Sequence, residues 1–187
     1  MKISIVRSAV LEAVDELGLE TADQKISSAA TSINSNKLPA VYNLVKFNKG
    51  DVVLDYGGGK FDNAVMYLKD LGVTLLVYDP YNRSADHNKS VMEALRENGG
   101  ADAVVCSNVL NVIAEPAARK AVLKNMYNLC KSGAPIYITV YEGNKSGQGA
   151  ETKAGYQLNK ATAGYLEEIA EVFPNAKRKG KLIIATK

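Results

Sequence analysis

The sequence has few of the side chains that usually form metal or disulfide sites. It contains two cysteines, Cys106 and Cys130, with no CxxC spacing, and a single histidine, His87. This inventory excludes a zinc site of any usual spacing, so we predict no metal. Cys106 lies inside an apolar run, which favours a small core residue. Such sparse use of cysteine indicates a reducing, cytoplasmic location.

Long apolar runs and a strong excess of charge are also missing. No run has the length of a membrane span, and Arg7 interrupts the opening apolar segment too early for a signal peptide, so we expect no membrane partner and no export. The net charge of +3 is too small to indicate nucleic acid by itself. A basic cluster at Lys177, Arg178, Lys179 and Lys181 could contact phosphate, although a solvated hairpin face is the favoured interpretation.

The composition that is present fits one globular domain. The 187 residues are 47% hydrophobic and 23% charged, which is enough to bury a core without disulfides or metal. Residues 1–47 are predicted to form an N-terminal helical extension, because apolar residues recur at helical spacing over 6–17 and Pro39 suits the first turn of a short helix ending near Phe47. Residues 50–187 form the predicted core.

The predicted core alternates between short apolar strands and helices. Strands are expected at 51–55, 73–78, 101–107 and 135–141, helices at 62–71, 88–97, 116–131 and 160–172, a Gly-rich loop at 143–157 and an antiparallel hairpin at 177–186. This alternation predicts an α/β fold with a doubly wound, mostly parallel sheet covered on both faces. Ligands of such sheets bind at the carboxyl ends of the strands.

Two features follow the first two strands. The first strand runs into Asp55-Tyr56-Gly57-Gly58-Gly59-Lys60-Phe61-Asp62, where three glycines allow a tight turn and a close approach of a ligand to the backbone. The second strand ends at Asp79, where an acidic side chain can accept both hydroxyls of a ribose. Either feature alone is common, but together they predict adenosine binding.

NAD and S-adenosylmethionine (SAM) both contain adenosine. The NAD fingerprint, counted from Gly57, requires glycine where Asp62 stands, so the sequence favours SAM. The runs VVLDYGGGKFD, LLVYDPYN and ADAVVCSNVLNVI resemble the class I, Rossmann-like SAM-dependent methyltransferases. Within that superfamily, about residues 37–187 look most similar to small methyltransferase-like proteins found in phages and beside DNA phosphorothioation genes. In those proteins a Gly/Thr-rich stretch precedes a glutamine, to which Gln157 corresponds here.

The resemblance implies a division of roles at the strand ends. The residues that would hold the amino-acid part of SAM are Asp55, Gly57, Gly58 and Gly59. Asp79 would hold the ribose, and Pro80 and Tyr81 would flank the adenine. Asn108 and Asn111 would face the methionine end or the substrate.

Two departures from the family pattern stand out. Phe61 replaces the usual last glycine of the cofactor loop. Too few residues separate Asp79 from Asp102 for the strand that usually supplies an acid to the adenine, so we predict one strand fewer than the seven-stranded norm. The loop residues Asp86, His87 or Asn88 could replace that acid.

Methyl transfer needs no diagnostic nucleophile, because orientation and proton removal are the enzyme's main contributions. Tyr141 and Glu142 follow the fourth predicted strand and are the candidate catalytic residues, with Glu142 as a general base or simply an exposed side chain. The loop at 143–157 is either a lid or an ordinary surface loop. Neither local motif of nucleobase methylation is present: Ser107 and Asn108 are followed by no proline, and Cys106 has no proline before it and lies within the strand.

The sequence thus predicts a SAM-dependent methyltransferase acting on an unidentified small molecule or nucleic-acid component. The alternative is a protein that binds or sequesters SAM without catalysis. An NAD(P)-dependent oxidoreductase is disfavoured. The oligomeric state is not indicated.

Overall fold

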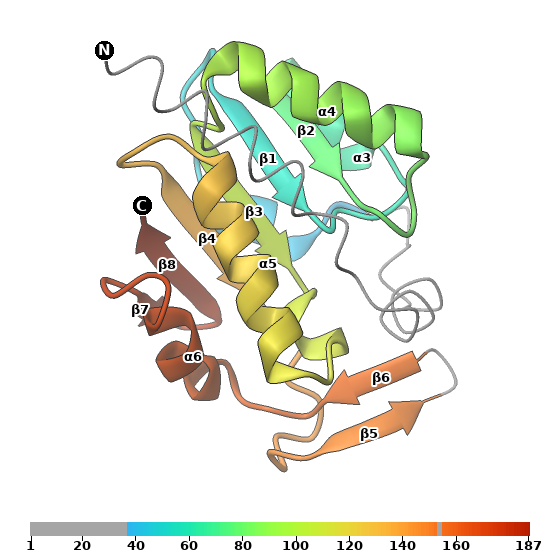
Figure 1. Ribbon diagram of the computed structural model, residues 1–187, viewed down its shortest axis with the longest axis vertical. Coiled ribbons are helices and arrows are strands. Elements are labelled where there is room, and N and C mark those ends of the chain that lie inside the picture. The colour runs from blue at the N-terminus through green and yellow to red at the C-terminus, as the bar shows by residue number, and fades with distance from the viewer. Residues whose placement is uncertain (1–36, 153–154) are drawn as a thin grey trace.

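The computed structural model describes residues 37–152 and 155–187 (Figure 1). The helix predicted over 6–17 lies outside these residues, as does most of the predicted N-terminal extension. The remaining elements form one sheet with helices on both faces and a small separate hairpin.

Six strands form the central sheet, in the order β2-β1-β3-β4-β8-β7. The parallel strands are β1 (Val52–Tyr56), β2 (Thr74–Tyr78), β3 (Ala103–Ser107) and β4 (Pro135–Thr139). The closing hairpin consists of β7 (Lys177–Lys179) and β8 (Leu182–Thr186), and β8 runs antiparallel to β4. The predicted Rossmann-like sheet is confirmed, and within the described ranges it has one strand fewer than the seven-stranded norm.

The register brings the carboxyl ends of the parallel strands to one edge of the sheet. Asp55 of β1 lies opposite both Val77 of β2 and Val105 of β3, and Ser107 at the end of β3 lies opposite Thr139 of β4. The loops that follow β1, β2 and β3 therefore meet at this edge, where the sequence predicts a ligand.

Helices cover both faces of the sheet (Figure 1). On one face, α4 (Ala85–Asn98), α5 (Pro116–Leu129) and α6 (Leu166–Ala170) pack over a core that includes Leu54 and Val104. On the other, α3 (Asn63–Asp70) and the 3₁₀ turn η1 (Ala40–Asn43) pack over Val53 and Val105. Successive strand residues point to opposite faces, so burial on both faces explains the continuous apolar runs in the sequence.

The helix boundaries follow local signals. The Ser84 hydroxyl accepts a hydrogen bond from His87 N at the start of α4, and Gly99 ends that helix with φ 74°. Pro116 opens α5, where its missing N–H costs no hydrogen bond.

Three predicted segments differ from the structure. The loop predicted at 143–157 instead contains an antiparallel hairpin of β5 (Gly149–Thr152) and β6 (Gly155–Leu158), which extends one residue beyond it. These strands are too polar to be recognised from apolar alternation. The helix at 160–172 is shorter and consists of η3 (Thr162–Tyr165) followed by α6. The helix expected from Pro39 to Phe47 is only the single turn η1.

None of the helices in the described ranges combines the length and apolar character that a membrane crossing requires.

Candidate functional site

The glycine loop (residues 57–61) follows β1 and does not accommodate side chains at its glycines. Gly57 and Gly59 have φ values of 81° and 76°, the left-handed region that favours glycine. A Cβ on Gly57 would collide with the side chain of Val109, and one on Gly58 would lie 2.7 Å from Asp55 Oδ2. The backbone of this loop is therefore open to close approach only because it consists of glycines.

Asp55 lies under the glycine loop and is only 2% exposed. Its Oδ2 accepts a hydrogen bond of 2.5 Å from the hydroxyl of Tyr42, which comes from η1. Its Oδ1 is buried and has no hydrogen-bond partner among residues 37–152 and 155–187. Such an oxygen is costly to leave unsatisfied, and it marks a place for a donor from a ligand.

A pocket opens beside Asp55. The loop contributes Gly57, Gly58, Lys60 and Phe61 to its lining, the start of α3 contributes Asn63 and Ala64, and the other lining residues are Lys37, Pro39 and Ser107. Asp55 is the acidic residue of this lining. The pocket therefore combines an acidic floor, backbone groups of the glycine loop and two lysines.

Burial raises the pKa of Asp55 to about 6, because a charge is disfavoured away from water. The hydrogen bond from Tyr42 lowers this pKa, the negative charge of Asp79 raises it, and the positive charge of Arg83 lowers it. At neutral pH the carboxylate is thus ionised at a cost in stability.

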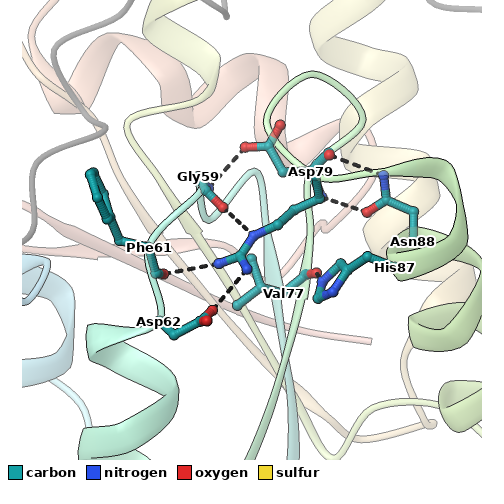
Figure 2. A network of polar contacts seen from close by, with 8 residues as sticks. Gly59, Phe61, Asp62, Val77, Asp79, His87 and Asn88 are labelled. Atoms are coloured by element: carbon teal, nitrogen blue, oxygen red, sulfur yellow. Dashed lines mark hydrogen bonds and ion pairs between the residues drawn. The ribbon is translucent and has the colours of Figure 1, made fainter.

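Asp79 is 4% exposed and lies at the end of β2. Its Oδ2 accepts a hydrogen bond of 2.9 Å from Gly59 N (Figure 2). Its Oδ1 accepts from the backbone N–H groups of Tyr81 and Asn82. The side-chain amide of Asn82 contacts both oxygens at 3.1 Å. A ribose that reached Asp79 would have to share its oxygens with the Asn82 amide or displace it.

The loop after β2 is held together by its own residues. Asn88 of α4 accepts from Asp79 N and donates to Asp79 O, and His87 Nε2 lies 2.8 Å from Val77 O (Figure 2). These contacts give His87 and Asn88 a structural role. Pro80 and Tyr81 are half-buried beside Asp79, so the predicted adenine contacts lie at the expected edge.

The two asparagines predicted to face the ligand, Asn108 and Asn111, contact different segments of the chain. Asn108 follows β3 with φ 58°, and its N–H donates to Thr139 O. Asn111 is buried, and its side-chain amide donates to Gln157 Oε1 and accepts from Tyr141 N. Asn111 therefore attaches the β5–β6 hairpin to the end of β4, and Ser107 is the pocket-lining residue of β3.

The two candidate catalytic residues are absent from the lining of this pocket in the described part of the chain. Tyr141 is 63% exposed. Glu142 Oε1 accepts hydrogen bonds from the backbone N and the hydroxyl of Thr162, and Oε2 pairs with Lys145. The hydrogen bond from Thr162 N, together with these contacts, lowers the pKa of Glu142 to about 2. The carboxylate thus caps η3 and is a weak proton acceptor, which argues against the predicted general base.

Two residues that the sequence analysis missed are central to the site. Tyr42 reaches Asp55 from before β1, and Arg83 reaches the glycine loop from after β2. A lone tyrosine or arginine in a loop carries no local signal of either contact. Within the described ranges, no cluster of His, Cys, Asp or Glu could hold a metal ion.

Replacing Asp55 with asparagine should stabilise the protein at neutral pH. The folded pKa of about 6 lies above the ordinary value of 3.8, so the folded state loses stability as the pH rises through this window. An amide carries no charge, and Asp55→Asn should raise the free energy of unfolding at pH 7.5 by up to about 3 kcal/mol. The gain should vanish as the pH falls to 4, which urea unfolding at several pH values measures.

Asp102→Asn is the control of opposite sign. Although burial raises the pKa of Asp102, hydrogen bonds from Lys131, Val52 N and Asn98 outweigh it and lower that pKa. This variant should lose stability at neutral pH, with the loss shrinking as the pH falls. The change in free energy of unfolding from wild type to Asp55→Asn should be larger at pH 7.5 than at pH 4. A smaller change at pH 7.5 contradicts the assignment of Asp55 as a buried charge that destabilises the fold.

Comparisons with known proteins agree with this geometry. Among solved structures, the chain is similar to PigF with SAH, with 19% identity over 79% of this chain and 53% of that chain and a TM-score of 0.57. It is also similar to phosphoethanolamine N-methyltransferase 2 of Haemonchus contortus, with 16% identity over 81% and 42% of the two chains and a TM-score of 0.51. A SAM-dependent methyltransferase from Methanosarcina mazei matches with 14% identity over 82% and 99% and a TM-score of 0.51.

At these identities the solved structures show the shared fold alone. The chain spans about half the length of the first two of them. No protein of curated function matches the sequence. The narrower resemblance to phage and phosphorothioation-associated proteins finds no support in these comparisons.

A family model described as a methyltransferase domain matches residues 29–173. This range includes the glycine loop, Asp79 and the strands that carry them. The methyltransferase domain predicted from the sequence is therefore confirmed, and the chain belongs to the methyltransferase domain family.

Proposed function

We propose that the protein transfers a methyl group from SAM to an unidentified small molecule or nucleic-acid component. The observation that carries the proposal is Asp55, which lines a pocket built on glycine backbone and whose buried Oδ1 has no hydrogen-bond donor among the described residues. The α-ammonium of SAM is a charged donor that would satisfy this oxygen. A charge-assisted hydrogen bond of this kind is stronger than a neutral one.

The residues at the sheet edge fit the remaining parts of SAM. Gly57 and Gly58 leave room for the amino-acid part beside Asp55, and Ser107 lines the same pocket. Asp79, on the neighbouring strand, would accept the ribose hydroxyls, with Pro80 and Tyr81 beside the adenine. NAD lacks the amino-acid part that the acidic pocket would hold, so the pocket favours SAM.

SAM supplies an electrophilic methyl group on a sulfonium. The residues of this chain bind and orient it: Asp55 and the glycine loop fix one end, and Asp79 fixes the other. Such orientation is a major part of the catalysis of methyl transfer. Because Glu142 is a weak base, an acceptor whose proton is lost easily, or an acceptor with a free lone pair, suits this site best.

The proposal also includes two kinds of acceptor, a nucleic-acid component or a small molecule, and a cytoplasmic location. Lys177, Arg178, Lys179 and Lys181 are all exposed on or beside the edge strand β7, where charge also prevents pairing with other strands. This face could hold a phosphate of a nucleic-acid component, while a small-molecule acceptor needs only the pocket. Cys106 and Cys130 are free thiols, as a cytoplasmic protein requires.

The proposal is tested by calorimetric titration of the full chain with SAM, S-adenosylhomocysteine and NADH. We expect micromolar binding of the two adenosyl ligands and none of NADH. Asp79→Ala should weaken this binding at least tenfold, because the ribose loses its acceptor. Formation of S-adenosylhomocysteine from SAM is then measured with a metabolite extract and, separately, with total nucleic acid as acceptor.

Each outcome decides a different alternative. Binding of NADH alone overturns the proposal. Binding of the adenosyl ligands without turnover on either acceptor pool favours the protein that binds SAM without catalysis. Turnover on nucleic acid that falls steeply with salt identifies the basic β7 face as part of the acceptor site.

Gly58→Ala provides a second test of the pocket. Its Cβ would lie 2.7 Å from Asp55 Oδ2 and 2.8 Å from Val77 Cγ1, so the loop must shift. We expect a loss of about 1–3 kcal/mol in the free energy of unfolding and at least a tenfold loss in affinity for S-adenosylhomocysteine.

Gly133→Ala is the matched control, since Gly133 precedes β4 at the opposite edge of the sheet and an added Cβ meets nothing within 4 Å. Its φ of 81° makes alanine strained there, at a cost of about 1 kcal/mol, without an effect on ligand affinity. Equal losses of affinity in the two variants would contradict a ligand at the glycine loop.

A further inference from the structure

The glycine loop has backbone carbonyls that need partners outside the loop. From Gly57 to Phe61 the chain is neither strand nor helix, so the carbonyls of these residues are not paired by regular secondary structure. The conformation of this loop therefore depends on contacts with other segments.

Arg83 supplies those contacts with three of its nitrogens. Its Nε donates to Gly59 O at 2.7 Å and its Nη2 donates to Phe61 O at 2.9 Å, while Nη1 pairs with Asp62 Oδ1 at 2.8 Å (Figure 2). The Arg83 side chain is 11% exposed, although it belongs to a loop. A planar guanidinium can hold several acceptors in fixed directions, which a lysine ammonium cannot do.

The loop that carries Arg83 is itself attached to Asp79, the residue proposed to hold the ribose. Arg83 N donates to Asp79 O, and Asp79 Oδ2 accepts from Gly59 N. Both polar backbone groups of Gly59 are thus bound to the β2–α4 loop, the N–H by Asp79 and the carbonyl by Arg83. Gly59 thus joins the two halves of the candidate cofactor site through both of its backbone groups, in addition to the contacts of Arg83 with Phe61 and Asp62.

We propose that Arg83 is a positioning residue for the cofactor, which holds the glycine loop in its binding conformation relative to Asp79. The inference rests on the proposed function, because it concerns the affinity of the same site. Arg83 acts through the backbone of Gly59 and Phe61 and takes no part in the chemistry of methyl transfer. Its side chain fixes the carbonyls on both sides of Lys60.

Three variants separate the carbonyl contacts from the ion pair. Arg83→Ala removes all three contacts, and Arg83→Lys keeps the charge but cannot reach both carbonyls at once. Asp62→Asn removes only the ion pair with a carboxylate that is 60% exposed, and such exposed pairs contribute little. We expect both Arg83 variants to bind S-adenosylhomocysteine about tenfold more weakly by calorimetry, and Asp62→Asn to stay within twofold of the wild type.

Hydrogen–deuterium exchange of the ligand-free proteins provides a readout that a general loss of stability does not explain. The amides of residues 57–61 should exchange faster in both Arg83 variants and at the wild-type rate in Asp62→Asn, while β3 and β4 stay protected in all three. If Arg83→Ala does not fold, Arg83→Lys decides the question.

The two proposals fail in different ways. If the wild type binds S-adenosylhomocysteine and both Arg83 variants bind it within twofold, the proposed function stands and the role of Arg83 is overturned. A loss of affinity in Asp62→Asn equal to that in Arg83→Lys also overturns it, because the ion pair would then be the cause. If the wild type binds neither SAM nor S-adenosylhomocysteine, the proposed function fails, and the exchange of residues 57–61 alone shows whether Arg83 orders the loop.

Discussion

The hydrogen bond from Gly59 N to Asp79 Oδ2 joins the loops that follow β1 and β2. It exists because parallel pairing places the ends of these strands side by side, with Tyr56 opposite Tyr78. The same carboxylate holds the backbone of Tyr81 and Asn82, so the loop that leads to Arg83 is arranged around it. The glycine loop, Asp79 and the start of α4 therefore form one connected edge of the sheet.

The buried carboxylate of Asp55 lowers the stability of the fold at this edge of the sheet. Its carboxylate is almost completely buried and receives one hydrogen bond from Tyr42, and Oδ1 has no donor in the part of the chain that the structure describes. A structure selected for stability alone would place a neutral side chain there. A buried carboxylate with one oxygen that lacks a hydrogen-bond donor is instead typical of a site that completes its hydrogen bonds with a ligand. The family match and the geometry thus support the same conclusion from independent observations.

The sequence was sufficient to predict the sheet and the positions of Asp55 and Asp79, because apolar runs and glycines report on strands and their ends through local patterns. It did not reveal Tyr42 and Arg83, whose partners come from other elements and whose residue types carry no motif. Asn111 and Glu142 were assigned by their place after a strand, yet their side chains bind Gln157 and Thr162 of later segments. Position along the chain predicts which edge a residue reaches, whereas its partners depend on tertiary packing.

A crystal structure of the full chain with S-adenosylhomocysteine tests the central claim most directly. The account predicts that the amino group of the ligand lies within hydrogen-bond distance of Asp55 Oδ1, that its amino-acid part contacts the backbone of the glycine loop, and that its ribose hydroxyls contact Asp79. A ligand bound elsewhere, or one whose adenosine occupies this edge while Asp55 Oδ1 stays without a donor, would contradict it.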